Sequence, residues 1–531
     1  MDITAWLTAF APILTLLVLL LFLRWGGDEA AVASLLVALL GGAFVFGAAA
    51  DHLAVAAAKG MWTSVSIIYV IFPALLIYEL SAAAGAFSVI RRGMQSFTPD
   101  AVLQVIAIGW IFADFLQGIT GFGVPVVVCA PLLIGMGVKP VTAVVISLFG
   151  QAWGNTFGTL GLAWDGLAGQ AAFAAGEEEA TLLWSSNLLV FLNVATGFSI
   201  VYLAGGMKGL VRNVPLVFIL SVLQGIGQTA VALFSPMLSN FIVATVSMGL
   251  IFFIGKLPMY RAPQPLHDAE EVKETAEDAS GGAQSGMTLG GAFLPYIILV
   301  ILAVGILMND AAKEALGALK FSLAFPEKVT AAGFVAKGSD AYAPLTVLLH
   351  SGTFLLTSAV IGYLRYVQKG YLKSSAMSGI VSKALQKTLP AGIAVIGLIA
   401  MSKVMDDTGQ TMVLARGAAD LAASGYPLLS PFIGLLGTFM TGSNLSSNIL
   451  FAGFQQQVAG MLGISKVQLL AAQTAGGATG SILSPAKVLL GTTAAGVLGS
   501  EGLVLRKVMP LALGVSAVYG VIVYLSYAMG G

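Results

Sequence analysis

Apolar stretches long enough to cross a lipid bilayer follow one another along most of this 531-residue chain. A helical span of the hydrocarbon core needs about 20 apolar residues. Only 9% of the residues are charged, against about 25% in soluble domains. The sequence therefore predicts an all-α polytopic membrane protein with about 12 transmembrane helices. We expect them at residues 5–23, 31–50, 62–85, 141–164, 182–204, 214–233, 237–254, 292–308, 343–364, 388–405, 467–497 and 509–528.

Two further apolar regions, 101–138 and 427–463, are interrupted near their centres by small and polar residues. The interruptions are GITGFGVP (118–125) and TGSNLSSN (441–448). Residues 126–138 would reach only about 20 Å as a helix, which is too short to cross. Irregular backbone at membrane depth is tolerated only where protein buries it or where it lines a cavity. Both regions are therefore predicted to be re-entrant helical hairpins with their tips near the middle of the membrane.

The distribution of basic residues indicates how the chain is oriented. With the N-terminus outside, most of the 25 basic residues, including Lys139, Lys208 and Lys507, fall on the cytoplasmic side. This is the bias that cytoplasmic loops of membrane proteins show. In this orientation the first hairpin enters from the cytoplasm and the second from outside. The two hairpins are therefore expected to have opposite topology.

A weak repeat supports the same organisation. Residues Gln151–Gly158 and Gln473–Gly480 both read Q-x-x-G-x-x-x-G, and each motif follows a hairpin. Inverted-topology repeats with interrupted helices are typical of secondary transporters. We expect N-terminal helices at 1–60, a first repeat at 61–254, connecting helices at 292–387 and a second repeat at 388–531. Residues 255–291 are hydrophilic, and they form either a flexible cytoplasmic tether or an acidic regulatory tail.

The hairpin tips carry the predicted binding site. A helix that begins inside the membrane exposes unpaired N–H groups with partial positive charge, and an anion can bind there. Short polar side chains and flexible glycines stand at both tips; they are Thr120, Gly121, Gly123, Ser443, Asn444, Ser446, Ser447 and Asn448. The motif segments would add Gln151, Asn155, Thr156, Gln473, Thr474 and Thr479. The alternative is that these side chains cap helix ends and satisfy one another, and that the glycines serve helix packing.

Ionisable residues inside apolar segments are functional candidates by default. Asp114 and Glu79 are the candidates for proton coupling, because a carboxyl group can give up its charge when it is loaded. Lys487 either attracts an anion or neutralises Asp114 or Glu79. Lys403 is expected to partner Asp406 or Asp407, and His350, placed in mid-span, is expected to be a packed, hydrogen-bonded histidine. Zero net charge, one cysteine and the lack of a Cys/His cluster point to no nucleic-acid surface, disulfide, metal or cofactor.

Three segments resemble the lactate permease family: FLQGITGFGVPVVVCAPLLIGMGVKP (115–140), MTGSNLSSNILF (440–451) and AAQTAGGATGSILSPAKVL (471–489). The resemblance covers most of the chain. It implies transport of L-lactate, D-lactate or glycolate with protons, by a protein of a wider group whose inverted repeats contain re-entrant hairpins and whose members are often homodimers. The sequence departs from the family pattern at Gln117, where Glu is usual, and at Asn444, where Asp is usual. Neither amide can take up a proton, so coupling is expected at Asp114, at Glu79 or at another group.

The sequence thus predicts a proton-coupled permease for lactate or a related 2-hydroxymonocarboxylate in the plasma membrane. A Na⁺-coupled carboxylate or inorganic-anion transporter is the nearest alternative, because amides and carbonyls also suit Na⁺. An anion channel is less compatible with two opposed hairpins. An intramembrane enzyme is disfavoured, since the sequence offers no nucleophile–base pair, metal cluster or nucleotide loop.

Overall fold

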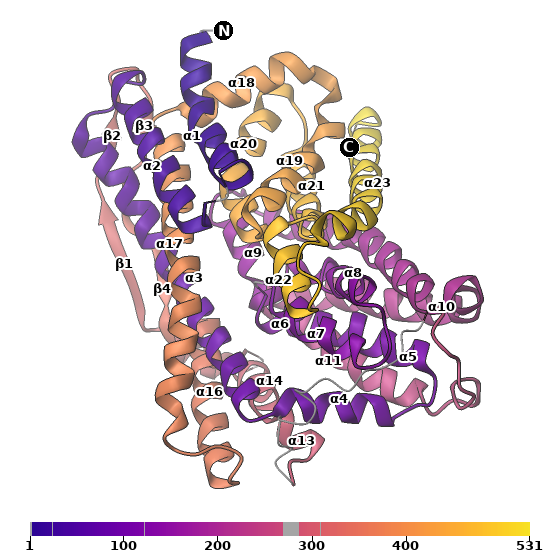
Figure 1. Cartoon of the computed structure of the whole chain (residues 1–531). Helices are drawn as coiled ribbons and strands as arrows, with labels where there is room; N and C mark the ends of the chain where they lie inside the picture. Colours follow the sequence, from indigo (N-terminus) through magenta and orange to yellow (C-terminus); the bar gives the residue numbers. More distant parts are fainter. Residues whose placement is uncertain (1–2, 24, 122, 269–285, 308, 531) are drawn as a thin grey trace.

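Helices dominate the structure, a computed structural model that describes residues 3–23, 25–121, 123–268, 286–307 and 309–530 (Figure 1). They gather into two bundles. The first, the α3–α17 bundle, draws on both halves of the chain and contains α1 (Ile3–Leu21), α2 (Gly27–Phe44), α3 (Ala50–Ala83), α4 (Ala86–Ser96), α13 (Leu289–Ala292), α14 (Leu294–Leu307), α15 (Asp310–Gly317), α16 (Ser351–Gln368) and α17 (Ala376–Asp407).

The second, the hairpin bundle, contains both regions that were predicted as hairpins. Its first half comprises α5 (Ala101–Ile106), the π-helical turn η1 (Ala107–Phe112), α6 (Ala113–Ile119), α7 (Val124–Ile134), α8 (Pro140–Gly150), the 3₁₀ turn η2 (Trp153–Asn155), α9 (Gly158–Ala168), α10 (Glu177–Phe234) and α11 (Pro236–Ile254). Its second half comprises α18 (Gln410–Ala422), α19 (Tyr426–Thr441), α20 (Asn444–Leu462), α21 (Lys466–Gly480), α22 (Pro485–Ala494) and α23 (Glu501–Ala528). Further 3₁₀ turns are η3 (Pro258–Tyr260), η4 (Val347–Leu349) and η5 (Ala423–Gly425).

The chain is a multi-pass membrane protein. Within the described part of the chain, nine helices are long and apolar enough to cross a membrane, or ten if α14 and α15 form one bent span. The predicted spans 182–204 and 214–233 both lie in α10, which bends at Gly206, where φ is 59° and ψ is −159°. Glycine reaches that backbone conformation without the steric penalty that other residues meet.

Two predicted spans are wrong as continuous helices. The span 141–164 is broken between α8 and α9, and Thr159 and Leu160 adopt left-handed φ angles of 50° and 52°. The span 467–497 is broken between α21 and α22. Ser484 caps the start of α22 and Pro485 is its first residue, a pairing that favours a new helix because proline lacks an N–H group.

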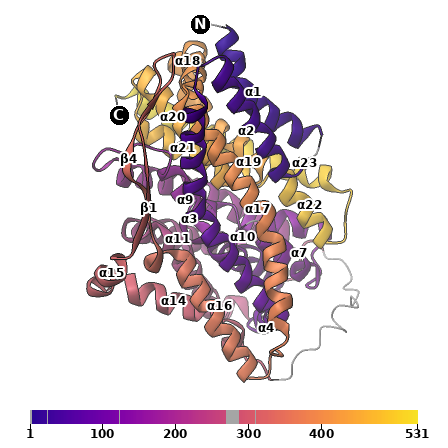
Figure 2. The same ribbon diagram turned by 90° about the vertical axis from the view of Figure 1, so that its left-hand side faces the viewer.

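The prediction of an all-α fold also needs correction. Between α15 and α16 the chain forms four short strands, β1 (Lys320–Phe325), β2 (Lys328–Val329), β3 (Val335–Ala336) and β4 (Ser339–Thr346). β1 pairs with β4 and β2 pairs with β3, both antiparallel, and the ribbon lies along α3 (Figure 2). Trp62 of α3 fastens β4 by donating its indole N–H to the carbonyl of Tyr342 at 3.0 Å. The predicted span 343–364 therefore begins as a strand, continues through η4 and becomes α-helical only at Ser351.

The predicted domain limits coincide only partly with element ends. The first repeat was expected to end at residue 254, and α11 ends at Ile254. Residues 60 and 387, two other limits, lie inside α3 and α17. Of the predicted linker, residues 255–268 and 286–291 are described and include η3, while 269–285 lie outside the described residues.

α3 and α17 pack closely enough to require glycine at their contact. A Cβ atom on Gly60 would lie 2.4 Å from the Cα atom of Ala400. At the same end, Lys59 pairs with Asp407 at 3.2 Å and donates to the carbonyl oxygen of Lys337 at 2.9 Å. Asp407 is thus paired with Lys59 rather than with Lys403, which interacts electrostatically with Asp406.

Replacing Gly60 should weaken the whole α3–α17 bundle. We expect Gly60→Ala to cost about 1–3 kcal/mol of unfolding free energy, because the added methyl group meets backbone atoms that have no room to yield. The measurement is thermal unfolding of the purified protein in detergent. Gly379→Ala is the matched control in α17, where no atom lies near the added methyl group, and it should be neutral or slightly stabilising. Equal melting temperatures for the two variants would contradict this packing.

Candidate functional site

A small polar cavity of about 30 Å³ lies where four interrupted segments of the hairpin bundle meet. The segments are the α6–α7 and α19–α20 connections and the breaks between α8 and α9 and between α21 and α22. The volume is enough for water and for little more. The lining residues are Gln117, Asn155, Gly158, Thr159, Leu162, Ala163, Gly442, Ser443, Asn444, Leu445 and Lys487.

Helices begin at this cavity with local caps. Ser443 precedes α20, and its hydroxyl accepts from the Ser446 N–H at 3.5 Å. Ser484 precedes α22, and its hydroxyl accepts from the Lys487 N–H at 3.4 Å. The predicted polar loop 441–448 is therefore shorter than expected, because only Gly442 and Ser443 lie between α19 and α20. The first turns of α20 and α22 carry the partial positive charge of helix N-termini.

Glycines bring the two connections against the broken helices. Gly121 has a φ of 55°, and a Cβ atom there would lie 2.2 Å from the Thr159 hydroxyl oxygen. Gly123 has a φ of 85° and abuts Leu490 of α22, and Gly442 has a φ of 77° and faces Ser484. A side chain at these positions would be strained and would separate the segments. The predicted role of Gly121 and Gly123 in close approach thus has a geometric basis.

Lys487 is the cation of this site. Its ammonium group is buried, and it donates to the side-chain oxygens of Gln151 and Asn155, each at 3.2 Å. Among the described residues it forms no ion pair. The sequence left two roles open for Lys487. In the structure Lys487 does not pair with Asp114 or Glu79, so it does not neutralise either carboxylate.

Asn155 and Gln117 complete the surroundings of Lys487. The Asn155 amide donates to the Gln151 carbonyl at 2.7 Å and to the Ser481 hydroxyl at 3.0 Å, which aims its oxygen at the ammonium group. Gln117 donates to that same oxygen at 3.4 Å. The Gln117 Oε1 and Gln151 Nε2 atoms are buried and have no hydrogen-bond partner in the described part of the chain.

A second polar cluster ties the start of α20 to both broken helices. Thr474 receives hydrogen bonds from the amides of Asn448 at 2.9 Å and of Asn444 at 3.4 Å. Asn444 also donates to Thr156 at 3.2 Å, and the hydroxyls of Thr156 and Thr474 lie 3.2 Å apart. The side-chain oxygens of Asn444 and Asn448 are buried with no partner among the described residues.

Most of the remaining predicted residues of the tips and motif segments donate to one another or to helix carbonyls, as the alternative interpretation had it. Gln473 donates to the Ser447 hydroxyl at 3.1 Å, and Ser447 donates to the Gly434 carbonyl at 2.8 Å. Thr120 and Thr479 each donate to a carbonyl one helical turn earlier, at 2.8 and 3.0 Å. Ser446 is buried in the first turn of α20. None of these side chains lines the cavity.

The acidic candidates occupy different places. Asp114 is fully buried in α6, where the Asn240 amide donates to its backbone carbonyl at 3.2 Å. A Cβ atom on Gly154 would lie 2.3 Å from Asp114 Oδ1 and 2.5 Å from Asn240 Oδ1, so these two oxygens are neighbours beside η2. Glu79 instead pairs with Lys387 at 2.5 Å in the α3–α17 bundle. Asp114, and not Glu79, thus belongs to the segments that build the cavity.

His350 is hydrogen-bonded, as expected, but it does not lie in mid-span. It caps the start of α16, where its Nδ1 atom accepts from the Gly352 N–H at 3.2 Å and its Nε2 atom lies 2.8 Å from the Ser66 hydroxyl. Within the described part of the chain, no group of three or more His, Cys, Asp or Glu side chains could hold a metal ion.

Several residues of the site were not predicted as such. Thr159 lines the cavity from a strained left-handed position, and Ser481 fixes Asn155. Gln117 was noticed only as a departure from the family pattern. The signals were present in the sequence, since Ser484-Pro485 marks a helix start and the glycines around Thr159 mark a break.

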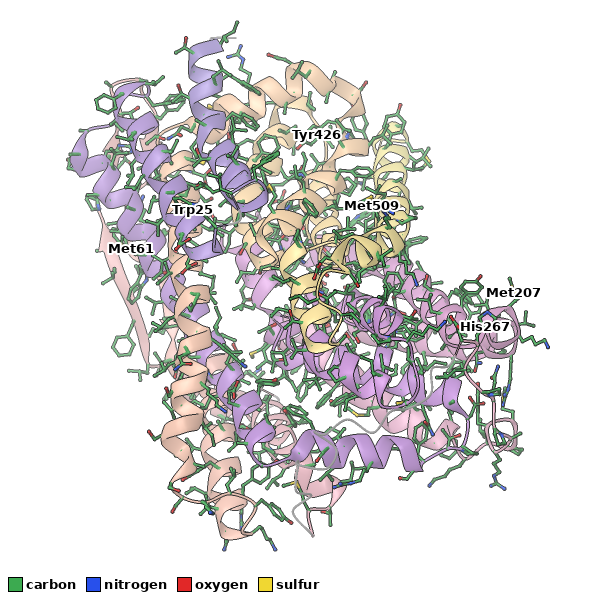
Figure 3. The ribbon with its side chains drawn as sticks, viewed as in Figure 1. Trp25, Met61, Met207, His267, Tyr426 and Met509 are labelled. Atoms are coloured by element: carbon green, nitrogen blue, oxygen red, sulfur yellow. The ribbon has the colours of Figure 1, made fainter. Side chains whose placement is uncertain are left out.

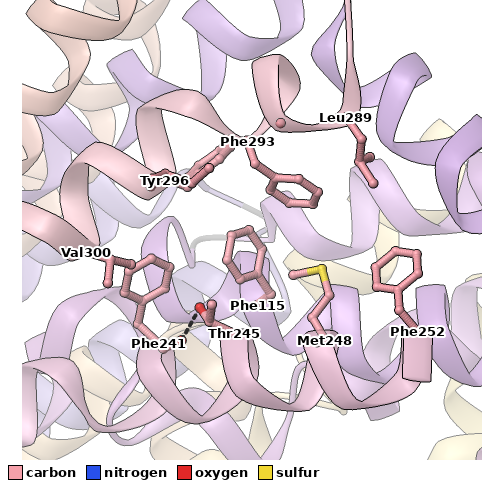
Figure 4. Close-up of a pocket in the computed structure, with 12 residues that line it drawn as sticks. Phe115, Phe241, Thr245, Met248, Phe252, Leu289, Phe293, Tyr296 and Val300 are labelled. Carbon is pink, nitrogen blue, oxygen red and sulfur yellow. Dashed lines mark hydrogen bonds between the residues drawn. The ribbon is translucent and has the colours of Figure 1, made fainter. Parts of the chain in front are cut away.

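A larger cavity of about 280 Å³ is unsuited to a polar solute. It lies between α6 and α11 of the hairpin bundle and α13 and α14 of the α3–α17 bundle, and its walls are almost wholly apolar (Figure 4). The Thr245 hydroxyl donates to the Phe241 carbonyl at 2.7 Å, so it is not free for a ligand. Phe115 of α6 meets Phe293 and Tyr296 edge-on at 5.7 and 5.4 Å, and these rings join the two bundles.

In sequence this chain is similar to lactate and glycolate permeases. Residues 5–529 match the family model described as L-lactate permease. The L-lactate permease of Halalkalibacterium halodurans is 27% identical over 527 residues, which cover 97% of this chain and 96% of the relative. The glycolate permease GlcA of Escherichia coli is 30% identical, with 98% of this chain and 95% of the relative covered. A solved structure of the YdaH transporter of Alcanivorax borkumensis has 14% identity and a TM-score of 0.41, over 87% of this chain and 85% of that chain.

The Thr474 hydroxyl should be needed to hold α20 against the broken helices. We expect Thr474→Val to lower the unfolding free energy by about 1–3 kcal/mol, because the buried amide groups of Asn444 and Asn448 lose an acceptor. Thr474→Ser keeps the hydroxyl and should cost less than about half of that. Thermal unfolding in detergent measures both. A Val variant as stable as the Ser variant would contradict the role given to this hydroxyl.

Proposed function

The chain belongs to the L-lactate permease family, and from that premise we propose that it carries lactate or a related 2-hydroxymonocarboxylate such as glycolate across the plasma membrane. The members of this family are permeases, so the chain is a transporter and not an enzyme. The lactate and glycolate permeases among its relatives support a small hydroxy acid as the substrate.

One observation carries the proposal: among the described residues, the buried Lys487 ammonium group donates hydrogen bonds to two amide oxygens and to no carboxylate. A buried charge without a counter-charge costs several kcal/mol, and an opposite charge offsets that cost. The carboxylate of the substrate supplies this charge. Lys487 itself lies in the N-terminal turn of α22, and the first residues of α20 line the same cavity. The partial positive charge of both helix starts would stabilise the same carboxylate.

The 2-hydroxyl group of the substrate has acceptors at the same cavity. The Gln117 Oε1 and Asn444 Oδ1 atoms are buried and lack partners among the described residues. A hydroxyl group that donates to either oxygen satisfies a group that otherwise loses hydrogen bonding on burial. The cavity holds little more than water, so binding of a hydroxy acid requires the segments around it to move apart.

Proton symport through Asp114 is the favoured coupling mechanism. Its Oδ1 atom and the Asn240 side-chain amide both lie beside Gly154, so a proton on the carboxyl group could be donated to the amide oxygen. Glu79 is already paired with Lys387, which favours Asp114 for this role. Asp114 is also next to Gly154 of η2, so its protonation state can influence the helix break that positions Asn155.

Sodium coupling is the second candidate. Gln117 and Asn444 line the same cavity, and their side-chain oxygens are buried without partners in the described part of the chain. Amide and carbonyl oxygens are hard ligands of the kind that small cations prefer. Na⁺ bound by these oxygens would take the place of the proton at Asp114.

Alternating access is proposed to come from movement of the hairpin bundle past the α3–α17 bundle. In this scheme α6–α7 and α19–α20 are re-entrant hairpins, and the repeats 61–254 and 388–531 are inverted. In each half of the hairpin bundle, a connection between two helices is followed by a broken helix, and this shared order supports the scheme. The predicted number of twelve membrane crossings is reached under three conditions. The bent helix α10 crosses twice, each broken pair (α8–α9 and α21–α22) crosses once, and α14 and α16 each cross as well. Assembly as a homodimer stays a prediction.

Removal of the Lys487 charge should impair substrate recognition. We expect Lys487→Gln to raise the apparent KM for labelled lactate by about 100-fold in proteoliposomes, because loss of one member of a buried charge pair costs several kcal/mol. Lys383→Gln, an exposed lysine of α17, is the matched control and should leave the KM unchanged. A wild-type KM in the Lys487 variant would refute the proposed carboxylate site.

Asp114→Asn should abolish proton coupling and leave the transport of lactate itself intact. We expect the variant to lose lactate accumulation driven by a pH gradient while it retains lactate–lactate exchange, because the amide stays neutral at all pH values. Glu79→Gln is the control and should still accumulate lactate. Uptake under imposed pH or sodium gradients measures both variants. Accumulation that follows sodium in the wild type, or survives in the Asp114 variant, would contradict proton coupling at this residue.

A further inference from the structure

An apolar groove runs along the seam of α8, α10 and α23, on the outside of the hairpin bundle. It encloses about 510 Å³. Most of its walls are aliphatic and aromatic; they include Val145, Phe149, Phe198, Leu203, Leu210 and Leu511. A groove of this kind between membrane helices is suited to hydrocarbon chains and offers little to a soluble metabolite.

One end of the groove opens into a basic pocket of about 140 Å³. Tyr202, Leu203 and Lys507 line both, so groove and pocket form one continuous surface. Lys139 at the start of α8 and His267 after η3 also line the pocket. Lys139 and Lys507 belong to the basic residues that are predicted to face the cytoplasm. Lys507 is exposed, and its charge interacts with that of Asp268.

The pocket has a fixed wall at the bend of α10. The His267 N–H donates to the Ala204 carbonyl at 2.8 Å, and the His267 ring lies over Gly206, where a Cβ atom would be 2.8 Å from the ring. Figure 3 places His267 beside Met207 at this bend. The segment after η3 thus holds the basic pocket in position against α10.

We propose that this surface binds one anionic phospholipid, with its acyl chains in the groove and its phosphate group between Lys507 and Lys139. Basic pockets at the cytoplasmic side of transmembrane helices recognise anionic headgroups in this way. The groove is what selects a lipid over a soluble phosphate compound, because most of the buried contact would be with hydrocarbon.

Asp268 influences how strongly this site binds a phosphate group. Its carboxylate pairs with Lys139 at 2.5 Å, and that ammonium group holds the pKa of Asp268 below its ordinary value. Asp268 therefore stays ionised near neutral pH and competes with a phosphate group for Lys139. Its removal should strengthen lipid binding, while removal of either lysine should weaken it.

Native mass spectrometry of the detergent-purified full chain, titrated with phosphatidylglycerol or phosphatidylcholine, tests the proposal. We expect one phosphatidylglycerol molecule to bind in preference to phosphatidylcholine. Lys507→Gln and Lys139→Gln should each weaken it by about fivefold, and Asp268→Asn should strengthen it by a similar factor. Arg506→Gln is the matched control, since this exposed neighbour of Lys507 does not line the site, and it should change nothing.

Four results would overturn the proposal. Equal binding of the two lipids would remove the role of the headgroup charge. An equal loss in the Arg506 variant would show general attraction rather than a site. Competition by glycerol phosphate, which has the headgroup without acyl chains, would indicate a site for a soluble anion. A Leu511→Asp variant that folds and still binds phosphatidylglycerol would exclude the groove. The proposal does not depend on the transported substrate, so its failure leaves the lactate proposal untouched.

Discussion

The contact between the Lys487 ammonium group and the amide oxygens of Gln151 and Asn155 is the interaction on which the candidate site depends. These three side chains come from the two broken helices. If the helices were continuous, the three side chains would not meet. The breaks cost backbone hydrogen bonds and place Thr159 and Leu160 in strained conformations. They also leave a buried positive charge that lacks a described counter-ion, beside two helix N-termini. That combination is costly for a structural site and useful for a site that receives an anion.

The membrane class and the meeting of the two predicted hairpin tips follow from the sequence, because apolar lengths and clusters of Gly, Ser and Asn have direct structural consequences. The sequence does not show which side chains bind a substrate and which only support the binding side chains. Thr120 and Ser447 look as suitable as Asn444, yet their hydroxyl groups are used by carbonyls of nearby helices. The Glu79–Lys387 pair joins residues far apart in the chain, so no local pattern predicts it. The β-ribbon was missed because its exposed strands resemble a polar loop.

The amides at Gln117 and Asn444 acquire a physical meaning in the structure. Asn444 donates through its Nδ2 atom to the Thr474 carbonyl at 3.1 Å and to the Thr156 hydroxyl. An aspartate could donate in this way only when protonated, so asparagine holds one hydrogen-bonding state at every pH. Gln117 likewise donates to Asn155 without a titratable group. Neither amide can carry a proton for coupling, whereas the carboxyl group of Asp114 lies beside Gly154 of η2 at one of the helix breaks.

The central claim is that the Lys487 ammonium group binds the carboxylate group of the substrate. Equilibrium binding of ligands to the purified protein tests this claim most directly. Calorimetric titration with lactate and with lactamide compares two ligands of nearly equal shape that differ in charge. We expect lactate to bind and lactamide to bind at least about 100-fold more weakly, because only lactate supplies the missing negative charge. Equal affinity for the two ligands would contradict the claim.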